Sequence, residues 1–535
     1  MKTKYYIPFI LGSLLFLAAL SVSCNDDDDL GAAPRLFTPV FSDESTATGN
    51  SIYLKWDKYT GAERYVLAIS KDNFATDPIA TFETDTTFYT IRDLEWDTQY
   101  QVRIQAFGNN VESYETFKTV KTDDYPTKLI TPVSDDVIDN AVRVKWSLSD
   151  DVYDKLEVVD GNDEIVKTVD ITPDEYQTGE MIIAGLSPQT TYRVSAYVGS
   201  EYKGKKTYTT LAAQAFEGSV VDLRDLTDEE ASDYITTDFI AGLEDNTTVV
   251  LNGGTAYKIS GATFTQKAVK FITGYSFQGK AIFAISSDFK MPADIPTSKI
   301  EFESIYFYTP DADETTSNYG AKYIFNLNPG KATYVSFEGC EFKFFRGIAR
   351  LQGAGSEVGK MIMNNCIFNR VAGYGLMNVD NAGATLSEMV LTNSTVLYAD
   401  KVLVNSKSTT TTSVTVDHCT FCYSPASGSG SYMFDFNGQN PTIQLTNSIF
   451  GPSTVPGSGA PYFRAASAPT VDNCYATSDY MVYINPTTLL ETGPIPDIIK
   501  YNKSITDIFA DPANFDFTIK DNSFPDKDAG DPRWR

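Results

Sequence analysis

The sequence predicts an all-β protein in which two β-sandwich modules precede a parallel β-helix. Tyr (32) and Phe (33), which favour strands, are abundant, while long amphipathic helical patterns are hard to find. One pattern of about ninety residues occurs twice in residues 35–211, and a much shorter phrase recurs through the rest of the chain. These three observations define the fold class, and the segments are taken below in chain order.

The first 34 residues are typical of an export signal followed by a tether. Lys2 and Lys4 precede an apolar run over residues 7–20, and small residues stand before Cys24. A cysteine at this place can accept a lipid, so we expect residues 1–23 to be a signal peptide and Cys24 to carry the anchor. Residues 24–34, with Asp26 to Asp29, would form an acidic tether. The alternatives are an ordinary signal peptide with an incidental cysteine, and a merely solvated spacer.

Net charge argues against a nucleic-acid partner, and hydropathy argues against a membrane span after Cys24. With 70 acidic and 43 basic residues the chain carries a net charge of −27, which repels phosphate backbones, so no nucleic-acid partner is expected. No apolar stretch after Cys24 is long enough to span a bilayer. We therefore expect everything after Cys24 to be soluble and held at the membrane by its lipid.

Two modules of similar size follow the tether. Leu54-Lys55-Trp56 opens the first and Val144-Lys145-Trp146 the second, while Leu94-x-Trp96-x-Thr98-x-Tyr100 and Leu186-x-Pro188-x-Thr190-x-Tyr192 close them. The tryptophans lie 90 residues apart (56 to 146) and the tyrosines 92 (100 to 192). A Trp fills the space between two sheets, and such a Tyr can return its hydroxyl to the backbone. Sandwiches are thus predicted over residues 35–124 and 125–211, with spacing as their main role and ligand binding as the alternative.

A short phrase recurs in the remaining chain: apolar, any, apolar, any, Asn-like, small, any, Phe-like. Measured from Gly339, its Asn-like positions are separated by 26, 28, 25, 29 and 26 residues. A β-patterned repeat of this length can bury its apolar face only by stacking on its neighbours. We therefore expect a parallel β-helix with a C-terminal cap over residues 212–535. The copies are residues 335–342, 361–368, 389–396, 414–421, 443–450 and 470–474.

Aligning the copies places equivalent residues in columns. Asn can bond along the axis at a turn, where left-handed geometry also suits it; the Asn-like column is Asn365, Asn393, His418, Asn447 and Asn473. His418, the single histidine, is expected to replace Asn there, with catalysis as the alternative. The next column alternates Cys and Ser, which predicts small buried fillers with free thiols and no metal site; it holds Cys340, Cys366, Ser394, Cys419, Ser448 and Cys474.

Several of these motifs resemble known families. The L-x-P-x-T-x-Y corner of the second module resembles fibronectin type III domains. The repeat, with its entry segment at residues 246–251 and the C-terminal runs 509–512 and 530–534, resembles the pectate-lyase-like right-handed β-helix. Together they resemble surface lipoproteins of Bacteroidota glycan-utilisation systems. This resemblance covers nearly the whole chain and implies a lipid-anchored outer-membrane protein, exposed at the cell surface, with a polysaccharide partner.

Binding of a linear polymer has direct support in the repeat. Phe344, Arg370, Tyr398 and Tyr423 stand five residues after the Asn-like positions and form a predicted aromatic column. Flat rings bind the apolar faces of sugars; the alternative is a stack that merely covers a turn. Residues 322–407 hold nine basic and six acidic residues, so this window would attract an acidic glycan such as a uronic-acid polymer.

A second candidate face comes from the strand after the turn. The alignment brings Arg350, Asn378, Asp435 and Arg464 into one column, with Asp380 two residues after Asn378. A lyase needs carboxylates that hold Ca²⁺ and a base, and a hydrolase needs paired carboxylates. Asp380 and Asp435 fall two coils apart. The sequence therefore shows neither the Ca²⁺-binding carboxylates of a lyase nor the paired carboxylates of a hydrolase.

The sequence therefore favours a surface lipoprotein that binds a plant or host polysaccharide for uptake and degradation, and needs no cofactor. The alternative is a polysaccharide lyase, which would use Ca²⁺, or a glycoside hydrolase on the same scaffold. A third hypothesis is an adhesin or a structural partner in a larger glycan-uptake complex.

Overall fold

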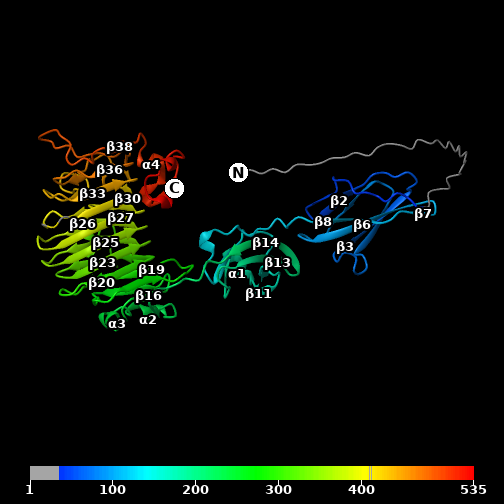
Figure 1. Cartoon of the computed structure of the whole chain (residues 1–535), viewed down its shortest axis with the longest axis horizontal. Coiled ribbons are helices and arrows are strands. Elements are labelled where there is room, and N and C mark those ends of the chain that lie inside the picture. The colour runs from blue at the N-terminus through cyan, green and yellow to red at the C-terminus, as the bar shows by residue number, and fades with distance from the viewer. Residues whose placement is uncertain (1–34, 409, 411) are drawn as a thin grey trace, which may run out of the picture. The chain divides into compact units, whose positions relative to one another are not determined.

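The computed structural model describes residues 35–535 except 409 and 411, and confirms the all-β prediction. These residues form two compact units. One holds residues up to Ile130 with Trp146–Gly179 and Arg193–Lys206, and the other holds Thr131–Lys145, Glu180–Tyr192 and Thr207–Arg535. Figure 1 labels the elements along the chain. Cys24 and Asp26 to Asp29, for which an anchor and a tether are predicted, lie outside the described residues.

The first fibronectin type III-like sandwich has two antiparallel sheets around Trp56, which is 2% exposed and meets the Tyr65 ring edge-on at 5.3 Å. The Tyr100 hydroxyl accepts a 3.0 Å hydrogen bond from the amide of Glu95, which confirms the predicted return to the backbone. One sheet is β1 (Thr46–Thr48), β2 (Ser51–Lys55) and β5 (Phe88–Ile91); the other is β4 (Ala80–Thr84), β3 (Arg64–Ser70), β6 (Gln99–Gly108), β7 (Val111–Glu112) and β8 (Thr116–Lys121).

The second copy of the pattern repeats these features. Trp146 is 3% exposed and stacks on Tyr176 at 5.9 Å, and the Tyr192 hydroxyl accepts a 2.9 Å bond from the Ser187 amide. Its strands are β9 (Ala141–Lys145) with β12 (Glu180–Ala184), and β11 (Ile165–Asp170), β10 (Lys155–Val159), β13 (Thr191–Val198) and β14 (Glu201–Thr209); short helices are η1 (Ser134–Asp136) and α1 (Pro173–Thr178).

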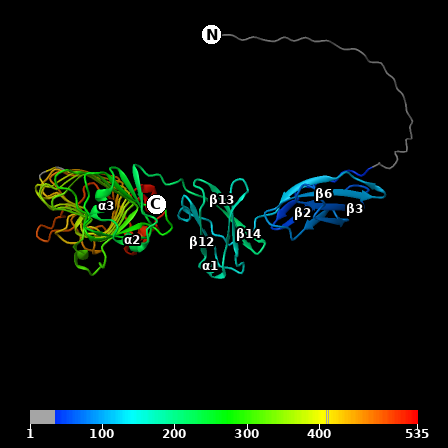
Figure 2. The same ribbon diagram turned by 90° about the horizontal axis from the view of Figure 1, so that it is seen from below.

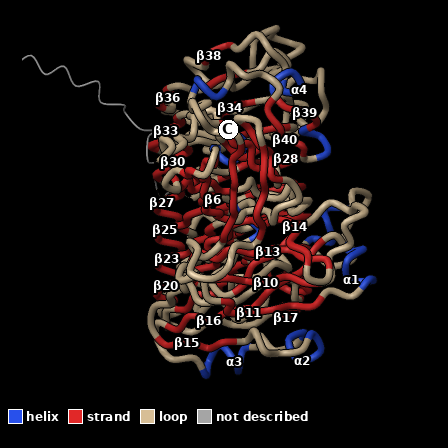
Figure 3. Tube along the Cα trace, turned by 90° about the vertical axis from the view of Figure 1, so that its right-hand side faces the viewer, coloured by secondary structure: helices blue, strands red, loops and turns tan. Residues whose placement is uncertain are grey.

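The remainder is the predicted right-handed parallel β-solenoid. Its first face is a ten-stranded parallel sheet whose strands lie one above another in chain order (Figure 3). These strands are β15 (Ser219–Asp222), β16 (Thr247–Leu251), β18 (Val269–Thr273), β20 (Thr297–Glu303), β23 (Lys331–Glu338), β25 (Glu357–Asn364), β27 (Thr385–Thr392), β30 (Ser413–Asp417), β33 (Thr442–Thr446) and β36 (Thr470–Asp472).

The second face is also parallel, and short strands branch from two of its members to make a third face. The second face holds β17 (Ala256–Ser260), β19 (Ala281–Ser287), β21 (Ile305–Tyr308), β24 (Glu341–Leu351), β26 (Ile367–Val379), β28 (Thr395–Ala399), β31 (Thr420–Cys422), β34 (Ile449–Phe450), β37 (Tyr475–Ala476) and β38 (Ile499–Lys500). The third face adds β22 (Phe325–Leu327), β29 (Leu403–Val404), β32 (Phe434–Asp435) and β35 (Phe463–Arg464) to the ends of β24 and β26.

Aromatic side chains stack along the inside of the solenoid from coil to coil. Phe302 and Phe337 lie 5.2 Å apart with their rings 12° from parallel, and Phe342 and Phe368 lie 4.7 Å apart. Stacking equivalent rings buries the apolar phrase that one coil alone would leave in water. The repeat thus builds its core by the interaction that its spacing predicts.

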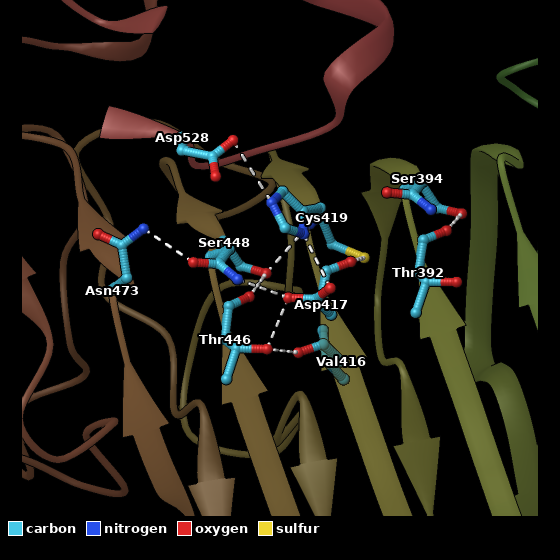
Figure 4. Close-up of polar contacts among 12 residues, drawn as sticks. Thr392, Ser394, Val416, Asp417, Cys419, Thr446, Ser448, Asn473 and Asp528 are labelled. Atoms are coloured by element: carbon cyan, nitrogen blue, oxygen red, sulfur yellow. Dashed lines mark hydrogen bonds and ion pairs between the residues drawn. The ribbon is translucent and has the colours of Figure 1, made fainter. Parts of the chain in front are cut away.

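The turn between the first and second faces carries the predicted polar ladder. Asn365, Asn393 and His418 have φ angles of 53°, 49° and 51°, in the left-handed region. Asn473 donates to the side chain of Asn447 at 2.8 Å, and Asn447 donates in turn to Asp417 at 2.9 Å, as Figure 4 shows around Asp417 and Asn473. His418 therefore occupies the Asn column, as predicted.

The Cys and Ser column lies directly behind this ladder. Within the described residues Cys340, Cys366, Cys419, Cys422 and Cys474 are free and buried, which confirms the prediction of free interior thiols. The Cys366 thiol donates to the carbonyl two residues earlier at 3.1 Å, and the Ser394 hydroxyl does the same at 2.6 Å. Cys and Ser alternate because both make this bond.

Helices and a strap close the solenoid. Seen along the axis, α2 (Asp228–Ser232) and α3 (Thr237–Gly242) lie across its N-terminal end (Figure 2). The C-terminal segment packs on the second face, and its residues 527–534, the C-terminal strap, follow the ladder. The other elements are η2 (Ser317–Ala321), α4 (Ile505–Ile508), β39 (Phe509–Asp511), η3 (Pro512–Asn514), β40 (Asp516–Ile519), η4 (Pro525–Lys527) and η5 (Pro532–Trp534).

The strap reaches from late coils back to early ones. The Lys527 carbonyl accepts from Asn473 at 3.0 Å, the Gly530 amide donates to the Asn447 carbonyl at 2.9 Å, and the Arg533 guanidinium donates to the Asn365 carbonyl at 2.6 Å. In the part of the chain that the structure describes, no helix is long and apolar enough to cross a membrane.

Candidate functional site

The third face carries a row of side chains at equivalent positions of successive coils. Strand register pairs Asn326 with Arg350, Arg350 with Asn378, and continues through Val404 and Asp435 to Arg464. The column predicted from the sequence is therefore confirmed, with Asn326 as a further member. We call these six residues the third-face row; they are Asn326, Arg350, Asn378, Val404, Asp435 and Arg464.

Both carboxylates of this face are bound by cations. Asp380 accepts from Arg350 Nε at 2.9 Å and pairs with Lys407 as well. Burial alone would raise the pKa of Asp380, but hydrogen bonds from Lys407 and Arg350 outweigh it and hold the pKa below its ordinary value. Asp435 is 5% exposed and takes two bonds from Arg464. Both carboxylates are thus engaged by cationic side chains of neighbouring coils.

Aromatic rings flank the row. The guanidinium carbons of Arg346 and Arg350 each lie 4.5 Å from the centre of the Tyr374 ring, and that of Arg464 lies 4.6 Å from Tyr432. Such contacts orient a guanidinium without neutralising it. Arg346 forms no ion pair within the described residues, and its Nε has no hydrogen-bond partner there. It is therefore a free cation on this face.

Two further polar atoms on this part of the coil have no partner among the described residues. They are the hydroxyl of Tyr323, which is 4% exposed, and Oδ1 of Asn326. The Tyr323 ring meets Tyr374 edge-on at 5.7 Å, so the hydroxyl, Arg346 and Arg350 belong to one cluster. Burial raises the pKa of Tyr323, although the nearby Arg346 and Arg350 oppose it. The sequence analysis did not single out Arg346, Tyr374 or Tyr432. Arg346 could have been found, because it lies in the basic window of residues 322–407.

The predicted aromatic column also exists as a geometric column. Arg370 lies 4.5 Å from the Tyr398 ring, and Tyr398 stacks on Tyr423 at 4.9 Å and 10°. Phe344, Arg370, Tyr398 and Tyr423 all have φ between 49° and 65°, because each stands at the same bend of its coil. The faces of Tyr398 are thus in contact with Arg370 and Tyr423.

The column is covered at both ends. Tyr423 is 7% exposed and belongs to a hydrophobic cluster with Ile505 and Phe509 of the C-terminal segment. Arg370 pairs with Glu314 at 2.5 Å, and Phe344 contacts Tyr319 at 5.4 Å. Tyr423, which the sequence predicts as a glycan contact, is thus a largely buried ring whose surroundings belong to the protein itself. The column is better described as the stack that covers a turn.

The third face can offer hydrogen bonds and ring contacts to a ligand. It combines a linear row of hydrogen-bonding groups, flanking tyrosines and one unpaired arginine, whereas Asp380 and Asp435 are tied to cations and poorly placed to move a proton. Among the residues described, no group of His, Cys, Asp and Glu side chains could hold a metal ion.

Comparison with known proteins adds little on function. The model of a Domain of unknown function (DUF5123) matches residues 414–534, and no curated protein matches the chain. The chicken CNTN1 FN1-FN3 domains share 17% identity at a TM-score of 0.15, over 34% of this chain and 69% of that one. A two-domain fibronectin type III segment of chicken tenascin shares 18% identity at a TM-score of 0.19, over 33% of this chain and 99% of that one. Each of these two structural matches covers about a third of this chain.

Proposed function

We propose that this chain is a lipid-anchored protein of the bacterial cell surface that binds an acidic polysaccharide along the third face of its β-helix. The single observation that carries the proposal is the free guanidinium of Arg346, held against Tyr374 beside the third-face row. A carboxylate of a uronic-acid unit is a matching partner, because guanidinium groups bind carboxylates through two parallel bonds.

The shape of the row supports a linear ligand. Parallel coils repeat about every 4.8 Å, so the row from Asn326 to Arg464 places one side chain at each step along the axis, with Arg350 and Arg464 as its partly exposed cations. Arg350 and Asp380 are held by each other, so the guanidinium has a fixed position on this face. A polymer lying along the axis would meet a guanidinium at two levels of this row, from Arg350 and from Arg464.

Charge favours an acidic polymer over a neutral one. The window 322–407 holds nine basic and six acidic residues in a chain of net charge −27. Arg346, Arg350 and Lys407 all come from this window. Attraction between such a face and a polyanion acts over about 10 Å at moderate salt and fades as salt rises.

Retardation in native gels tests the proposal. The purified protein should be slowed by polygalacturonate, alginate or chondroitin sulfate, and less so at high salt. Arg346→Ala and Arg464→Ala should each weaken the interaction roughly tenfold, whereas Arg64→Ala, an exposed arginine paired with Glu83 in the first sandwich, should not. Failure of the parent to bind any of the three polymers, or equal retardation of Arg346→Ala, would overturn the proposal.

The anchor has its own test. Cys24→Ala should abolish incorporation of labelled lipid and move the protein out of the membrane fraction. Neutral residues in place of Asp26 to Asp29 should keep the lipid but reduce cleavage by protease added to intact cells. If cleavage were unchanged, Asp26 to Asp29 would act only as a spacer.

A further inference from the structure

A separate hollow opens at the turn between the first and second faces. It has a volume of about 330 Å³ and lies where the C-terminal strap ends. The strap follows the ladder from Asn473 back to Asn365, and Arg533 forms one wall of the hollow. The groove that the strap fills on later coils is therefore open on the earlier ones.

Acceptor groups line one side of the hollow. Glu303 and Glu338 are register partners on β20 and β23, so their carboxylates come from adjacent coils. Glu303 pairs with Lys270 at 2.5 Å, and Glu338 accepts from Asn364 at 2.8 Å. Burial raises the pKa of Glu338, and the charge of Glu303 adds to this effect. The pair offers hydrogen-bond acceptors at two neighbouring levels.

The opposite side mixes donors and apolar surface. Lys280 pairs with Glu341, and both line the hollow with Arg533 and Ile367. Nη1 of Arg533 has no hydrogen-bond partner within the described chain, although Asp531 lies 3.6 Å away. Charges of both signs thus face one small space, which differs from a purely acidic cluster.

Two aromatic side chains stand next to one residue of the lining, Glu341. Tyr306 is the register partner of Glu341 on the preceding coil. Its ring stacks on that of Tyr308 with centroids 5.8 Å apart and planes within 9°. Both tyrosines are half-buried on the outer side of β21, and the C-terminal segment packs on later coils. A ligand in the hollow could therefore also lie against these rings.

We infer that this hollow is a second carbohydrate site, independent of the third face, which takes an uncharged, hydroxyl-rich sugar residue. Carboxylates accept from sugar hydroxyls, Lys280 and Arg533 donate to ring and hydroxyl oxygens, and the paired tyrosines cover an apolar sugar face. Glu303, Glu338 and Glu341 outnumber Lys280 and Arg533 in the lining, which favours an uncharged sugar over a uronate, so the ligand differs in charge from that of the third face. The volume suits one or two sugar units.

The experiment uses the whole protein and four neutral probes: galactomannan, xyloglucan, arabinan and dextran. Gel retardation and titration calorimetry should show binding to at least one of them. Tyr308→Ala and the isosteric Glu341→Gln should each weaken that binding tenfold or more while leaving the thermal midpoint close to that of the parent. Tyr334→Ala, a half-buried tyrosine on the first face that contacts Lys299, is the matched control and should change neither.

The outcomes separate the two sites. Tyr308→Ala should leave retardation by polygalacturonate unchanged, and Arg346→Ala should leave neutral-glycan binding unchanged. The inference is overturned if the parent binds none of the four neutral polymers, or if Tyr308→Ala and Glu341→Gln bind them as the parent does. Displacement of the neutral polymer by polygalacturonate would also overturn it, because one site would then serve both.

Discussion

Arg464 donates one hydrogen bond from Nε and one from Nη2, each 2.7 Å long, to the two carboxylate oxygens of Asp435 on the neighbouring coil. Asp435 is 5% exposed, whereas the Arg464 side chain is 40% exposed. Arg464→Ala would leave a buried carboxylate without its partner, so we expect the free energy of unfolding to fall by about 1–3 kcal/mol. Urea denaturation measures this, and Arg64→Ala should stay within about 0.5 kcal/mol of the parent. Equal losses in both variants would contradict the role of the pair.

Absence of catalysis is the second expectation. Because Arg350 and Lys407 hold the pKa of Asp380 below its ordinary value, this carboxyl is ionised at neutral pH and cannot donate a proton as a general acid. The parent should release neither unsaturated uronates nor new reducing ends from polygalacturonate, with or without Ca²⁺. Product release that Asp380→Asn abolishes, while gel retardation persists, would favour a lyase or hydrolase instead.

The stacked tyrosines should matter for stability and not for binding. Tyr423 is 7% exposed and lies under the C-terminal segment, so Tyr423→Ala should lower the free energy of unfolding by about 3 kcal/mol or more. Tyr398→Ala, at a half-buried ring, should cost less. Retardation by each polysaccharide should match the parent for both variants. Weaker polysaccharide binding by a folded Tyr398→Ala protein would contradict this expectation and indicate that the aromatic column contacts glycan.

Serine should replace Cys366 at little cost. The Cys366 thiol donates to the Asn364 carbonyl at 3.1 Å, and a hydroxyl makes the same contact at Ser394. Cys366→Ser should therefore destabilise the protein by no more than about 2 kcal/mol, as judged by thermal unfolding. Mass spectrometry without reductant should find free thiols at Cys340, Cys366 and Cys474, and a bridge between any two would contradict the interior column.

His418 should be replaceable by the residue that fills its column elsewhere. Its Nδ1 lies 2.8 Å from Asp417, and its Nε2 lies 3.6 Å from Asp528 of the strap. With φ at 51°, His418→Asn should be nearly neutral, whereas the β-branched His418→Val should cost about 1–2 kcal/mol. Chemical denaturation of the two variants distinguishes them. A large loss of any activity in His418→Asn would instead indicate a chemical role.

Much of the architecture could be predicted from periodicity. The alternation around Val335 and Met361 and the near-constant spacing of the Asn column define stacked coils, and the Tyr100 and Tyr192 corners define sandwiches. The third-face row was also accessible, because register follows directly from aligned repeats. These features depend on local pattern, which a single sequence contains.

Exposure of individual residues was not accessible in the same way. Tyr423 and Tyr398 occupy equivalent positions in their coils, yet Tyr423 is buried because Ile505 and Phe509, more than eighty residues later, pack beside it. Arg346 and Tyr374 were missed because they lie on β24 and β26 at the point where the register between these two strands shifts. Such relationships depend on tertiary contacts that no repeat pattern encodes.

The C-terminal strap changes how the solenoid can come apart. In a plain stack each coil contacts only its neighbours, so the end coils can open one at a time. The strap joins ladder residues 108 positions apart in the chain, from Asn365 to Asn473, and opening any coil between them must also release the strap. Unfolding of these coils should therefore be a concerted event. In folding, the strap can close only after all the coils beneath it have formed, so this long-range contact should come last and slow the final step.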